Sequence, residues 1–310
     1  MTSWRPSASL AALRARAGLL ARARSFLAGR GVLEVEVPLL QGGANLDHEV
    51  APFAVDTPDG PRWLITSPEH PLKRLVAAGC GDVYALTPVF RRGESGTRHA
   101  PAFTMLEWYR SGWDDRRLCA ETIDLLRHLT GLDGAVETLS FDEALRRHAG
   151  VGAEADAQAL AAALEPGQAE AARGDAAVLL DLVFSLRVQP RLGEGRWTVV
   201  DDWPADRAAQ ARLRPGRDGR TAAARFEVFR SGLELANGYH ELREAGELRA
   251  RLAAEAVRQP GAALDERFLA AMAHGLGDCA GVAMGFDRVV MLALGERDIS
   301  RVQAFGWDKA

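Results

Sequence analysis

Apolar residues recur with helical spacing near the start of the chain. Because residues three and four positions apart share one face of a helix, this spacing predicts an amphipathic helix over residues 9–29. Ser7 or Ser9 suits the N-cap of this helix, and Gly29 or Gly31 suits its end. The same reasoning predicts further helices over residues 71–78, 115–130, 245–259 and 286–294.

Runs of β-branched and aromatic residues between these helices predict strands. The expected strands cover residues 32–38, 63–66, 83–86, 198–200 and 281–285, with hairpins over 90–109 and 226–236. Pro38 has no N–H to donate, so it closes the first strand or marks a sheet edge. Strands separated by irregular loops, with few regular βαβ units, favour an α+β fold in which helices flank a mostly antiparallel sheet.

Two segments depart from this regular pattern. Residues 131–190 are Ala-rich, acidic and helical, without a chemical motif. We interpret them as a helical insertion in a single domain that spans residues 1–310, although length alone favours about two domains. Residues 205–223 form a polar stretch rich in Arg and Gly, which predicts a mobile loop.

Composition narrows the function classes. The net charge of −4 argues against broad electrostatic binding of nucleic acid, which needs many phosphate contacts. Lys73 and Lys309 are the only lysines; the excess of arginine indicates a GC-rich coding bias, so the positions of arginines are more informative than their number. No run of about eighteen apolar residues predicts a membrane span. Three widely spaced cysteines predict neither a disulfide framework nor a zinc site, and favour a cytoplasmic protein.

The hairpin over residues 90–109 concentrates charged and aromatic side chains. Its residues include Arg91, Arg92, Glu94, Arg98, His99, Phe103 and Tyr109. Guanidinium groups bind phosphate oxygens and a flat ring stacks on a base, so this mixture suits a polyphosphate joined to a purine. A solvated basic loop beside a core strand is the alternative.

Three glutamates, Glu227, Glu234 and Glu241, recur seven residues apart. Gly232 and Asn237 argue against a shared helix, and on a hairpin the first two glutamates can share a face. Mg²⁺, which binds one or two carboxylates together with substrate phosphates, would relieve their repulsion. Solvated sheet carboxylates are the alternative. Glu241 is a candidate for holding a substrate ammonium.

Two shorter motifs each have a functional and an ordinary interpretation. Gly285 permits close approach of a backbone at the end of a strand, and Arg288 in the first turn of the next helix suits a phosphate. An ion pair at the protein surface between Asp287 and Arg288 would explain this arginine equally well. Ser67-Pro68-Glu69 either faces a ligand or caps the helix that follows.

Together these motifs resemble the catalytic core of class II aminoacyl-tRNA synthetases, in particular the lysyl-tRNA synthetase branch. The strand that ends at Pro38 is similar to motif 1, the hairpin over 90–109 to motif 2, and residues 281–288 to motif 3. The similarity runs nearly end to end and includes residues 4–9, 31–36, 66–69, 103–110 and 234–242. Because the chain begins almost at motif 1, we expect no anticodon-binding domain.

The resemblance implies ATP and Mg²⁺ as cofactors and assigns site residues by position. Arg91 and Arg288 are the expected catalytic residues, at the α- and γ-phosphates. The expected ATP-binding residues are Arg91, Arg92, Gly93, Glu94, His99, Ala100, Phe103, Glu234, Leu235, Gly285 and Arg288. The expected amino-acid-binding residues are Ser67, Pro68, Glu69, Tyr109, Asn237, Glu241 and Ala283. Glu227 and Glu234 are the expected metal ligands.

Within that branch the chain resembles truncated paralogues that modify elongation factor P. This resemblance implies ATP-dependent activation of (R)-β-lysine, or of lysine, as the adenylate and its transfer to a lysine side chain of elongation factor P. It also implies a homodimer and argues against tRNA binding. A shortened lysine–tRNA ligase and a non-catalytic regulatory paralogue are the alternatives.

The match departs from the family at four positions. Ala283 stands where lysyl-tRNA synthetases carry a glycine, and one added methyl there would reshape the amino-acid pocket. Ala100 and Ala102 stand where many family members carry Asn and Glu, and the loop acid falls at Glu94 instead of Gly93. These three differences bear on ATP affinity.

Overall fold

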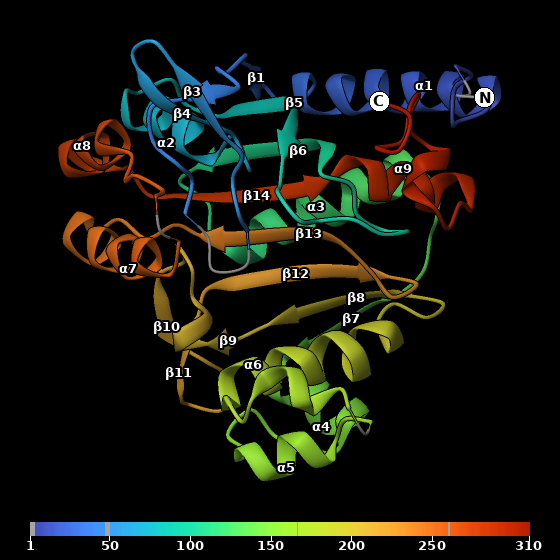
Figure 1. Ribbon diagram of the computed structural model, residues 1–310, viewed down its shortest axis with the longest axis vertical. Coiled ribbons are helices and arrows are strands. Elements are labelled where there is room, and N and C mark those ends of the chain that lie inside the picture. The colour runs from blue at the N-terminus through green and yellow to red at the C-terminus, as the bar shows by residue number, and fades with distance from the viewer. Residues whose placement is uncertain (1–3, 47–49, 166, 260) are drawn as a thin grey trace. The chain divides into compact units, whose positions relative to one another are not determined.

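Two compact units make up the chain. The computed structural model describes residues 4–46, 50–165, 167–259 and 261–310. Unit 1 comprises Met1–Leu132 and His240–Ala310, and unit 2 comprises Asp133–Tyr239; the colours in Figure 1 follow the chain through both. That the 310 residues form one domain stays a prediction. Within the described ranges, no helix is long and apolar enough to cross a membrane.

A mostly antiparallel sheet forms the centre of unit 1 (Figure 1). In sheet order, its strands are β1 (Leu33–Glu34), β5 (Val83–Phe90), β6 (Ala102–Ser111) and β14 (Cys279–Gly285). Only the β1–β5 pair is parallel among these strands of the described chain. A smaller antiparallel sheet contains β2 (Leu40–Gln41), β4 (Gly60–Leu64) and β3 (Ala54–Thr57).

Helices pack on both faces of the main sheet of unit 1. α3 (Asp115–Thr130) packs against β14, and α2 (Glu69–Ala77) packs against β5 and β6. Asp114 caps α3 by accepting the N–H of Arg117 over 2.8 Å. The other helices of unit 1 are α1 (Leu10–Ala28), α7 (Ala245–Arg258), α8 (Glu266–Gly275), α9 (Phe286–Leu294) and the 3₁₀ turn η5 (Ile299–Arg301).

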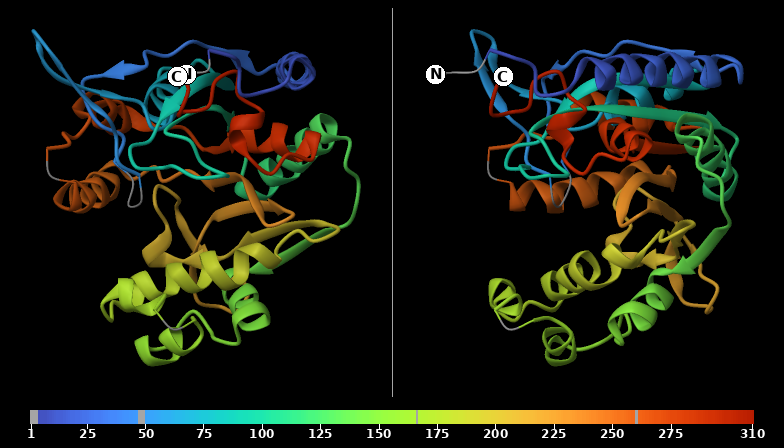
Figure 2. Two further views of the ribbon diagram at one scale, coloured as in Figure 1. Left: turned by 45° about the vertical axis from the view of Figure 1, so that its right-hand side comes forward. Right: turned by 90° about the vertical axis from the view of Figure 1, so that its right-hand side faces the viewer.

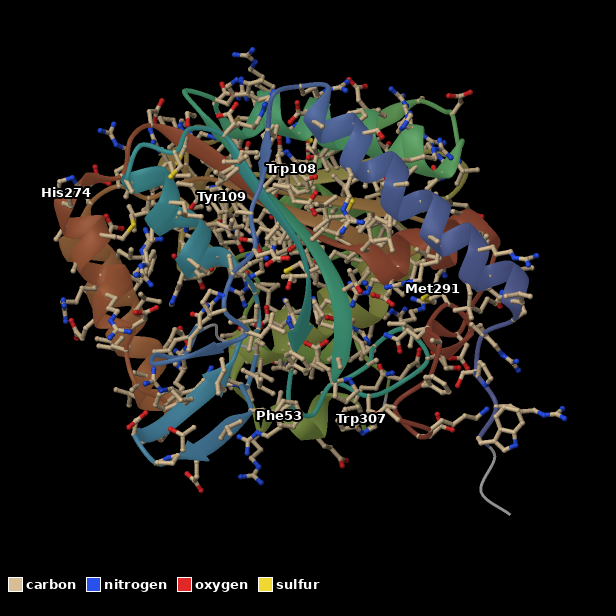
Figure 3. The ribbon with its side chains drawn as sticks, turned by 90° about the horizontal axis from the view of Figure 1, so that it is seen from above. Phe53, Trp108, Tyr109, His274, Met291 and Trp307 are labelled. Atoms are coloured by element: carbon tan, nitrogen blue, oxygen red, sulfur yellow. The ribbon has the colours of Figure 1, made fainter. Side chains whose placement is uncertain are left out.

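The alternation of side chains along β6 separates two packing environments (Figure 3). Successive residues of a strand point to opposite faces, so Trp108 and Tyr109 lie on different sides of the sheet. Trp108 donates its indole N–H to Glu121 of α3, over 3.1 Å. Tyr109 packs with Leu72 of α2 and Phe268 of α8 in the other core. The face that carries Tyr109 is therefore the one that α2 covers.

Unit 2 contains four strands of a mostly antiparallel sheet and a group of short helices (Figure 2). In order, the strands of the sheet are β13 (Leu233–His240), β12 (Arg225–Arg230), β8 (Trp197–Asp201) and β7 (Val136–Ser140). A small sheet contains β10 (Leu213–Pro215), β11 (Thr221–Ala223) and β9 (Trp203–Pro204). The helices are α4 (Phe141–Ala149), α5 (Ala157–Ala162) and α6 (Ala176–Val183), with short turns η1 (Ala169–Ala172), η2 (Phe184–Val188), η3 (Gln189–Arg191) and η4 (Ala205–Arg207).

The core of unit 2 is aromatic. The rings of Phe141, Phe184 and Trp203 have centroids 4.7 to 5.2 Å apart. Each is buried, together with leucines of the helical segments. Rings that pack at this spacing contribute beyond their buried area, so they fix the short helices to β8 and β9.

Most predicted helices and both predicted hairpins are confirmed. α1, α3, α7 and α9 each end within about one residue of the expected bounds, and α2 starts two residues early. α8 was not expected, although Asp265 caps it by accepting the N–H groups of Arg267 and Phe268. Its apolar positions are few and surrounded by alanine, which weakens the sequence pattern.

Three predicted segments differ from the structure. The strand expected over residues 32–38 is reduced to Leu33–Glu34, where the chain pairs with β5 before reaching the proline. The insertion expected to be helical over 131–190 contains strand β7, which pairs in parallel with β8. The loop expected over 205–223 contains β10 and β11, because Arg214 pairs with Asp202 over 2.5 Å and its neighbours enter a sheet.

Candidate active site

One face of the unit 1 sheet gathers residues from two strands. In the β6–β14 register, Tyr109 lies opposite Gly281 and Glu107 lies opposite Ala283. Residues opposite one another in a ladder share a face, as do alternate residues of one strand. These four positions therefore form one patch, on the side of the sheet that α2 covers.

The opposite face of β6 has a structural role. Arg110 pairs with Asp82 over 2.9 Å and with Glu121 over 3.1 Å. Its guanidinium is thus bound within the protein scaffold. Arg110 belongs to the hairpin that the sequence singled out, but these contacts give it no position at the patch.

Helix α2 brings a buried ion cluster to the patch. Lys73 Nζ lies 2.7 Å from Glu69 Oε1 and 2.6 Å from Glu241 Oε2. Glu69 and Lys73 are four residues apart, the spacing at which helical side chains meet. Lys73 and Glu241 are each only 1% exposed, so this ion pair is shielded from water.

Ser67 and Tyr109 hold a third carboxylate, that of Glu107. The Ser67 hydroxyl donates to Glu107 Oε2 over 2.6 Å, and the Tyr109 hydroxyl donates to Glu107 Oε1 over 2.7 Å. Ser67 Oγ also accepts the N–H of Glu69 over 3.0 Å at the start of α2. The triplet therefore begins α2 and supplies Glu69 as the acid of its first turn, but the N-cap is Pro68 and no side chain caps this helix, so the predicted capping role is wrong. The same segment contacts the patch.

The charges of this cluster shift one another's pKa values. Burial raises the pKa of Glu107 to about 7, and the nearby charge of Glu69 adds to the increase. Burial would also raise the pKa of Glu69, but the charges of Lys73 and His70, with hydrogen bonds from Lys73 and Asn45, together hold that pKa below its ordinary value. Burial alone would lower the pKa of Lys73, but Glu241 and Glu69 raise it instead. The cluster is therefore anionic around one fixed ammonium.

Gly281 leaves the space in which Tyr109 and Glu241 meet. A Cβ atom on Gly281 would lie 2.3 Å from Tyr109 Cε1 and 2.6 Å from Glu241 Oε1. Both distances are far below van der Waals contact. Only a residue without a side chain permits this arrangement of ring and carboxylate.

The β5–β6 hairpin places a cation beside an aromatic ring. The guanidinium carbon of Arg91 lies 5.2 Å from the centroid of the Phe103 ring, and its Nη1 lies 3.4 Å from Glu94 Oε1. Gly93 has a φ of +88°, a backbone conformation that favours glycine. Although the acid of this loop is at position 94 and not at position 93, its carboxylate still lies beside Arg91. Arg92 is exposed and Ala100 is buried.

Arg288 of α9 reaches the same hairpin. Its Nη2 lies 2.5 Å from His99 Nε2, and its Nε donates to the carbonyl of Arg98 over 3.4 Å. A guanidinium carries only donors, so the His99 nitrogen is the acceptor. Gly285 directly precedes α9, and its backbone has an extended conformation there. The structure thus brings Arg288 to His99 and Arg91 to Phe103 within unit 1.

Unit 2 holds Glu227, Glu234, Leu235 and Asn237 on its β12–β13 hairpin. Glu227 lies opposite Asn237, and Glu234 lies opposite Phe229, with an irregularity between the two pairs. Because Glu227 and Phe229 alternate on β12, both glutamates belong to one face. Carboxylate oxygens on a shared face fit the preference of Mg²⁺ for one or two carboxylates completed by phosphate oxygens. In the structure, Glu227 Oε1 forms an ion pair with Arg225 Nη2 over 2.5 Å.

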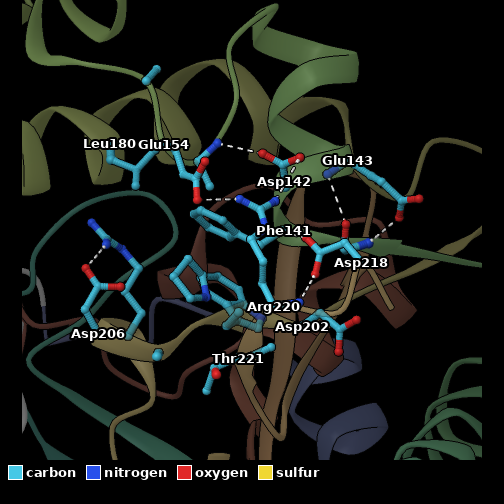
Figure 4. Close-up of a pocket in the computed structure, with 18 of the residues that line it drawn as sticks. Phe141, Asp142, Glu143, Glu154, Leu180, Asp202, Asp206, Asp218, Arg220 and Thr221 are labelled. Atoms are coloured by element: carbon cyan, nitrogen blue, oxygen red, sulfur yellow. Dashed lines mark hydrogen bonds and ion pairs between the residues drawn. The ribbon is translucent and has the colours of Figure 1, made fainter. Parts of the chain in front are cut away.

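A cavity of about 580 Å³ opens within unit 2 (Figure 4). Its apolar lining includes Phe141, Leu180 and Trp203, and its rim carries acids and arginines. Arg220, for example, pairs with Glu154 over 2.7 Å and with Asp218 over 2.6 Å. Of the described residues that line this cavity, none belongs to the predicted site. No group of three or more His, Cys, Asp or Glu able to hold a metal occurs in the ranges that the structure covers.

Glu107 and Lys73 are the members of the cluster that sequence reasoning missed. Glu107 is an acid inside an otherwise apolar and aromatic strand, and Lys73 is one of two lysines, four residues after Glu69. Charged residues are rarely buried unless they are paired. A charge at a core position of a predicted strand or helix was therefore a usable signal for both.

Known proteins with related sequences cover nearly the whole chain. Three relatives are each named elongation factor P–(R)-β-lysine ligase and are each 40% identical to it. The relative from Klebsiella pneumoniae subsp. pneumoniae aligns over 99% of this chain and 98% of its own length, as does the one from Salmonella dublin. For the relative from Edwardsiella ictaluri these shares are 100% and 99%.

A family model agrees with these relatives. The model described as tRNA synthetases class II (D, K and N) matches residues 1–309. The expected α+β fold, with mostly antiparallel sheets flanked by helices, is confirmed together with the family resemblance. The chain belongs to the class II tRNA synthetases of the D, K and N group.

Proposed function

We propose that this protein is an ATP-dependent ligase that activates (R)-β-lysine, or a close lysine analogue, and transfers it to a lysine side chain of elongation factor P. The observation that carries the proposal is 40% identity, over nearly the full chain, to relatives named as ligases of that kind. The buried carboxylates of Glu107 and Glu241, with the partly buried one of Glu69, suit the amino acid, because a lysine-like molecule carries two ammonium groups.

The amino acid would bind at the patch on unit 1. Tyr109 and Glu241 would bind the side-chain ammonium, and Ser67-Pro68-Glu69 would face the other amino group. Ala283 would narrow the floor of the pocket by one methyl, which discriminates between similar substrates by roughly 1–3 kcal/mol. Asn237 would bind the carboxylate.

The nucleotide would bind through the hairpin and α9. Phe103 would stack on adenine, Glu94 would bind its amino group, and Arg91 and Arg288 would contact the α- and γ-phosphates, with His99 assisting. The remaining expected contacts are Arg92, Gly93, Ala100, Glu234, Leu235 and Gly285. Aromatic stacking and paired guanidinium groups are the interactions that a purine triphosphate requires.

The reaction then needs little proton transfer from the protein. The substrate carboxylate attacks the α-phosphorus, the bond to pyrophosphate breaks, and an aminoacyl-adenylate forms. An amine of the acceptor attacks the acyl carbon, AMP leaves, and the amine loses a proton to solvent. Arg91 and Arg288 would stabilise the charge that develops on the phosphates, and positioning supplies much of the remaining acceleration.

Glu227 and Glu234 would hold Mg²⁺, since they supply hard oxygen ligands on one face of a hairpin. When bound, the ion would neutralise phosphate charge. We further propose that the protein is cytoplasmic and acts as a homodimer.

Pyrophosphate exchange with the purified full chain tests the activation step. We expect ATP- and Mg²⁺-dependent exchange with (R)-β-lysine, abolished by EDTA and restored by Mg²⁺. Absence of exchange with every lysine isomer would contradict the ligase and favour a regulatory protein.

Transfer of the radiolabelled amino acid identifies the acceptor. We expect labelling of elongation factor P and none of the same factor with its acceptor lysine replaced by arginine. Labelling of tRNA, with faster exchange for α-lysine, would instead identify a tRNA ligase.

A further inference from the structure

We infer that Lys73 is a positioning residue whose ammonium holds Glu69 and Glu241 ionised and aligned for the incoming amino acid. The inference rests on the proposed activation of a diamino acid and adds a residue that the proposed site did not contain. Lys73 is not assigned a contact with the substrate.

The geometry places Lys73 between two separate parts of unit 1. Its Nζ lies 2.7 Å from Glu69, on its own helix, and 2.6 Å from Glu241, which follows β13. The ammonium donates a charge-assisted hydrogen bond to Glu69 and lies at ion-pair distance from Glu241. One ammonium therefore ties the carboxylate of α2 to the carboxylate that lies over Gly281.

The second oxygen of each glutamate has a different neighbour. Glu69 Oε2 lies 3.4 Å from Asn45 Nδ2, and Glu241 Oε1 faces the space above Gly281, beside the ring of Tyr109. Lys73 thus binds one oxygen of Glu241 on the helix side and leaves the other directed at the patch. This is the orientation that a substrate ammonium over β14 requires.

Burial of these carboxylates makes the Lys73 ammonium necessary to keep them ionised. Glu69, Glu107 and Glu241 are three carboxylates in one water-poor cluster, and mutual repulsion and desolvation favour their protonation. Around Lys73 the titratable groups are Glu69 and His70 on α2, Glu107 and Tyr109 on β6, and Glu241 after β13. His70 is itself paired with Asp265 at the start of α8, over 3.3 Å.

Removing the charge of Lys73 would leave these carboxylates without their shared cation. The pKa values of Glu69 and Glu107 would rise, and at neutral pH the cluster would be more protonated than in the wild type. An ammonium binds a neutral carboxyl weakly, so amino-acid binding would suffer while ATP binding, which uses other residues, would not. A purely structural lysine would not produce this selective, pH-dependent loss.

The wild-type protein offers a direct measurement because its sequence contains only two lysines. In protein labelled with ¹⁵N-lysine, the side-chain signal of Lys73 should be protected from exchange with water, whereas Lys309 is exposed and should exchange rapidly. Saturating (R)-β-lysine should shift the Lys73 signal, and ATP alone should not. A Lys73 signal unaffected by the amino acid would overturn the inference, without any variant that must fold.

Kinetics of Lys73→Met provide the second test, with Lys309→Met as the matched control. We expect the KM for (R)-β-lysine in pyrophosphate exchange to rise about 10- to 100-fold, the size of a lost interaction with a charged group, with the KM for ATP unchanged. The KM for (R)-β-lysine falls as the pH rises, and the midpoint of this pH dependence should also move upward by about one pH unit or more in the variant. Lys309→Met should match the wild type.

Two outcomes separate this inference from the proposed function. If the wild type shows no exchange, the proposed function fails, whatever the variants do. If the wild type is active and Lys73→Met has an unchanged amino-acid KM and pH profile, only the role of Lys73 is refuted.

Discussion

At the scale of single residues, the site depends on what a position leaves out as much as on what it supplies. Gly281 has no side chain, and the ring of Tyr109 and the carboxylate of Glu241 fill the space above it. Glu107 supplies a charge where its strand neighbours supply rings, and two hydroxyl groups hold its carboxylate. Gly281 is thus explained by Tyr109 and Glu241, and Glu107 in part by Ser67, all of them partners distant in sequence.

We predict that Gly281→Ala weakens amino-acid binding selectively. The new methyl would displace Tyr109 or Glu241, and losing one such contact costs a factor of about 10 to 100 in KM for (R)-β-lysine. The KM for ATP should stay unchanged in pyrophosphate exchange. Gly277→Ala is the matched control, because nothing lies within 4 Å of the added atom. Equal effects of the two substitutions would contradict the geometry.

We predict that amino-acid affinity rises with pH through the titration of Glu107, whose pKa burial raises to about 7. Below that pH the carboxyl is protonated and cannot pair with an ammonium, so the Kd should increase by up to about tenfold per pH unit. Calorimetric titration from about pH 5.5 to about pH 8 measures this change. In Glu107→Gln the amino acid should bind more weakly, with a larger Kd, and the steep dependence of Kd on pH should be absent. If the variant retains this pH dependence, another group is responsible for the titration.

The same group links stability to pH with the opposite sign. The folded chain holds this proton more tightly than an ordinary glutamate with a pKa of 4.5 does. The stabilisation is therefore complete below about pH 4.5 and is lost as the pH rises through about 7. Burial of Glu107 thus makes the folded protein, without bound amino acid, less stable at the pH at which it binds the amino acid best.

At the scale of elements, Asp287 joins three parts of unit 1. It lies in the first turn of α9, is 1% exposed, and accepts the backbone N–H of Thr104 on β6 over 2.6 Å. Arg16 of α1 donates to Asp287 over 3.0 Å and to the hydroxyl of Thr104 over 2.8 Å. These contacts fix the start of α9, and with it the residue that follows, Arg288, against the hairpin.

We predict that Asp287→Asn lowers the free energy of unfolding by about 1–3 kcal/mol, because a buried charge-assisted network loses its anion. Denaturation in urea measures the change. Asp124→Asn, on the exposed face of α3, is the control and should stay within about 0.5 kcal/mol of the wild type. An equally small effect at Asp287 would show that the network contributes little.

At the scale of the whole molecule, most charges lie at the surface and contribute little to stability. Arg249 and Glu266 pair over 2.6 Å with side chains 50% and 64% exposed, and such pairs are typically worth about 0–1 kcal/mol. Apolar cores within each unit carry the folds. Compared with these surface pairs, binding of a ligand to the buried cluster would add substantially to the free energy of unfolding.

We predict that (R)-β-lysine raises the melting temperature of the full chain. At about 100 times its Kd, a ligand that binds only the folded state adds about 2.7 kcal/mol. Thermal unfolding with and without the amino acid measures this, and L-glutamate should produce no shift because its side chain is anionic. A shift that persists in Glu241→Gln at the same concentration would place the amino acid elsewhere.

Local patterns in the sequence determined the helices over residues 9–29, 115–130 and 286–294 and both hairpins. Helical and strand periods depend on neighbouring residues alone, so these elements were predictable. The motifs also predicted the family, because they resemble the motifs of its catalytic core and occur in the same order along the chain. Short strands such as β7 and β10 escaped prediction, since their pairing partners, and not their own residues, make them strands.

Only the tertiary structure decided what the charges do. From the sequence, Lys73 is a basic residue on a short helix and Glu107 an acid in a strand. Folding buries both beside Glu69, so that Lys73 becomes the counter-ion of Glu241 and Glu107 acquires a pKa near 7. The physical reason is that desolvation and Coulomb interaction depend on distances in space, which no local pattern contains.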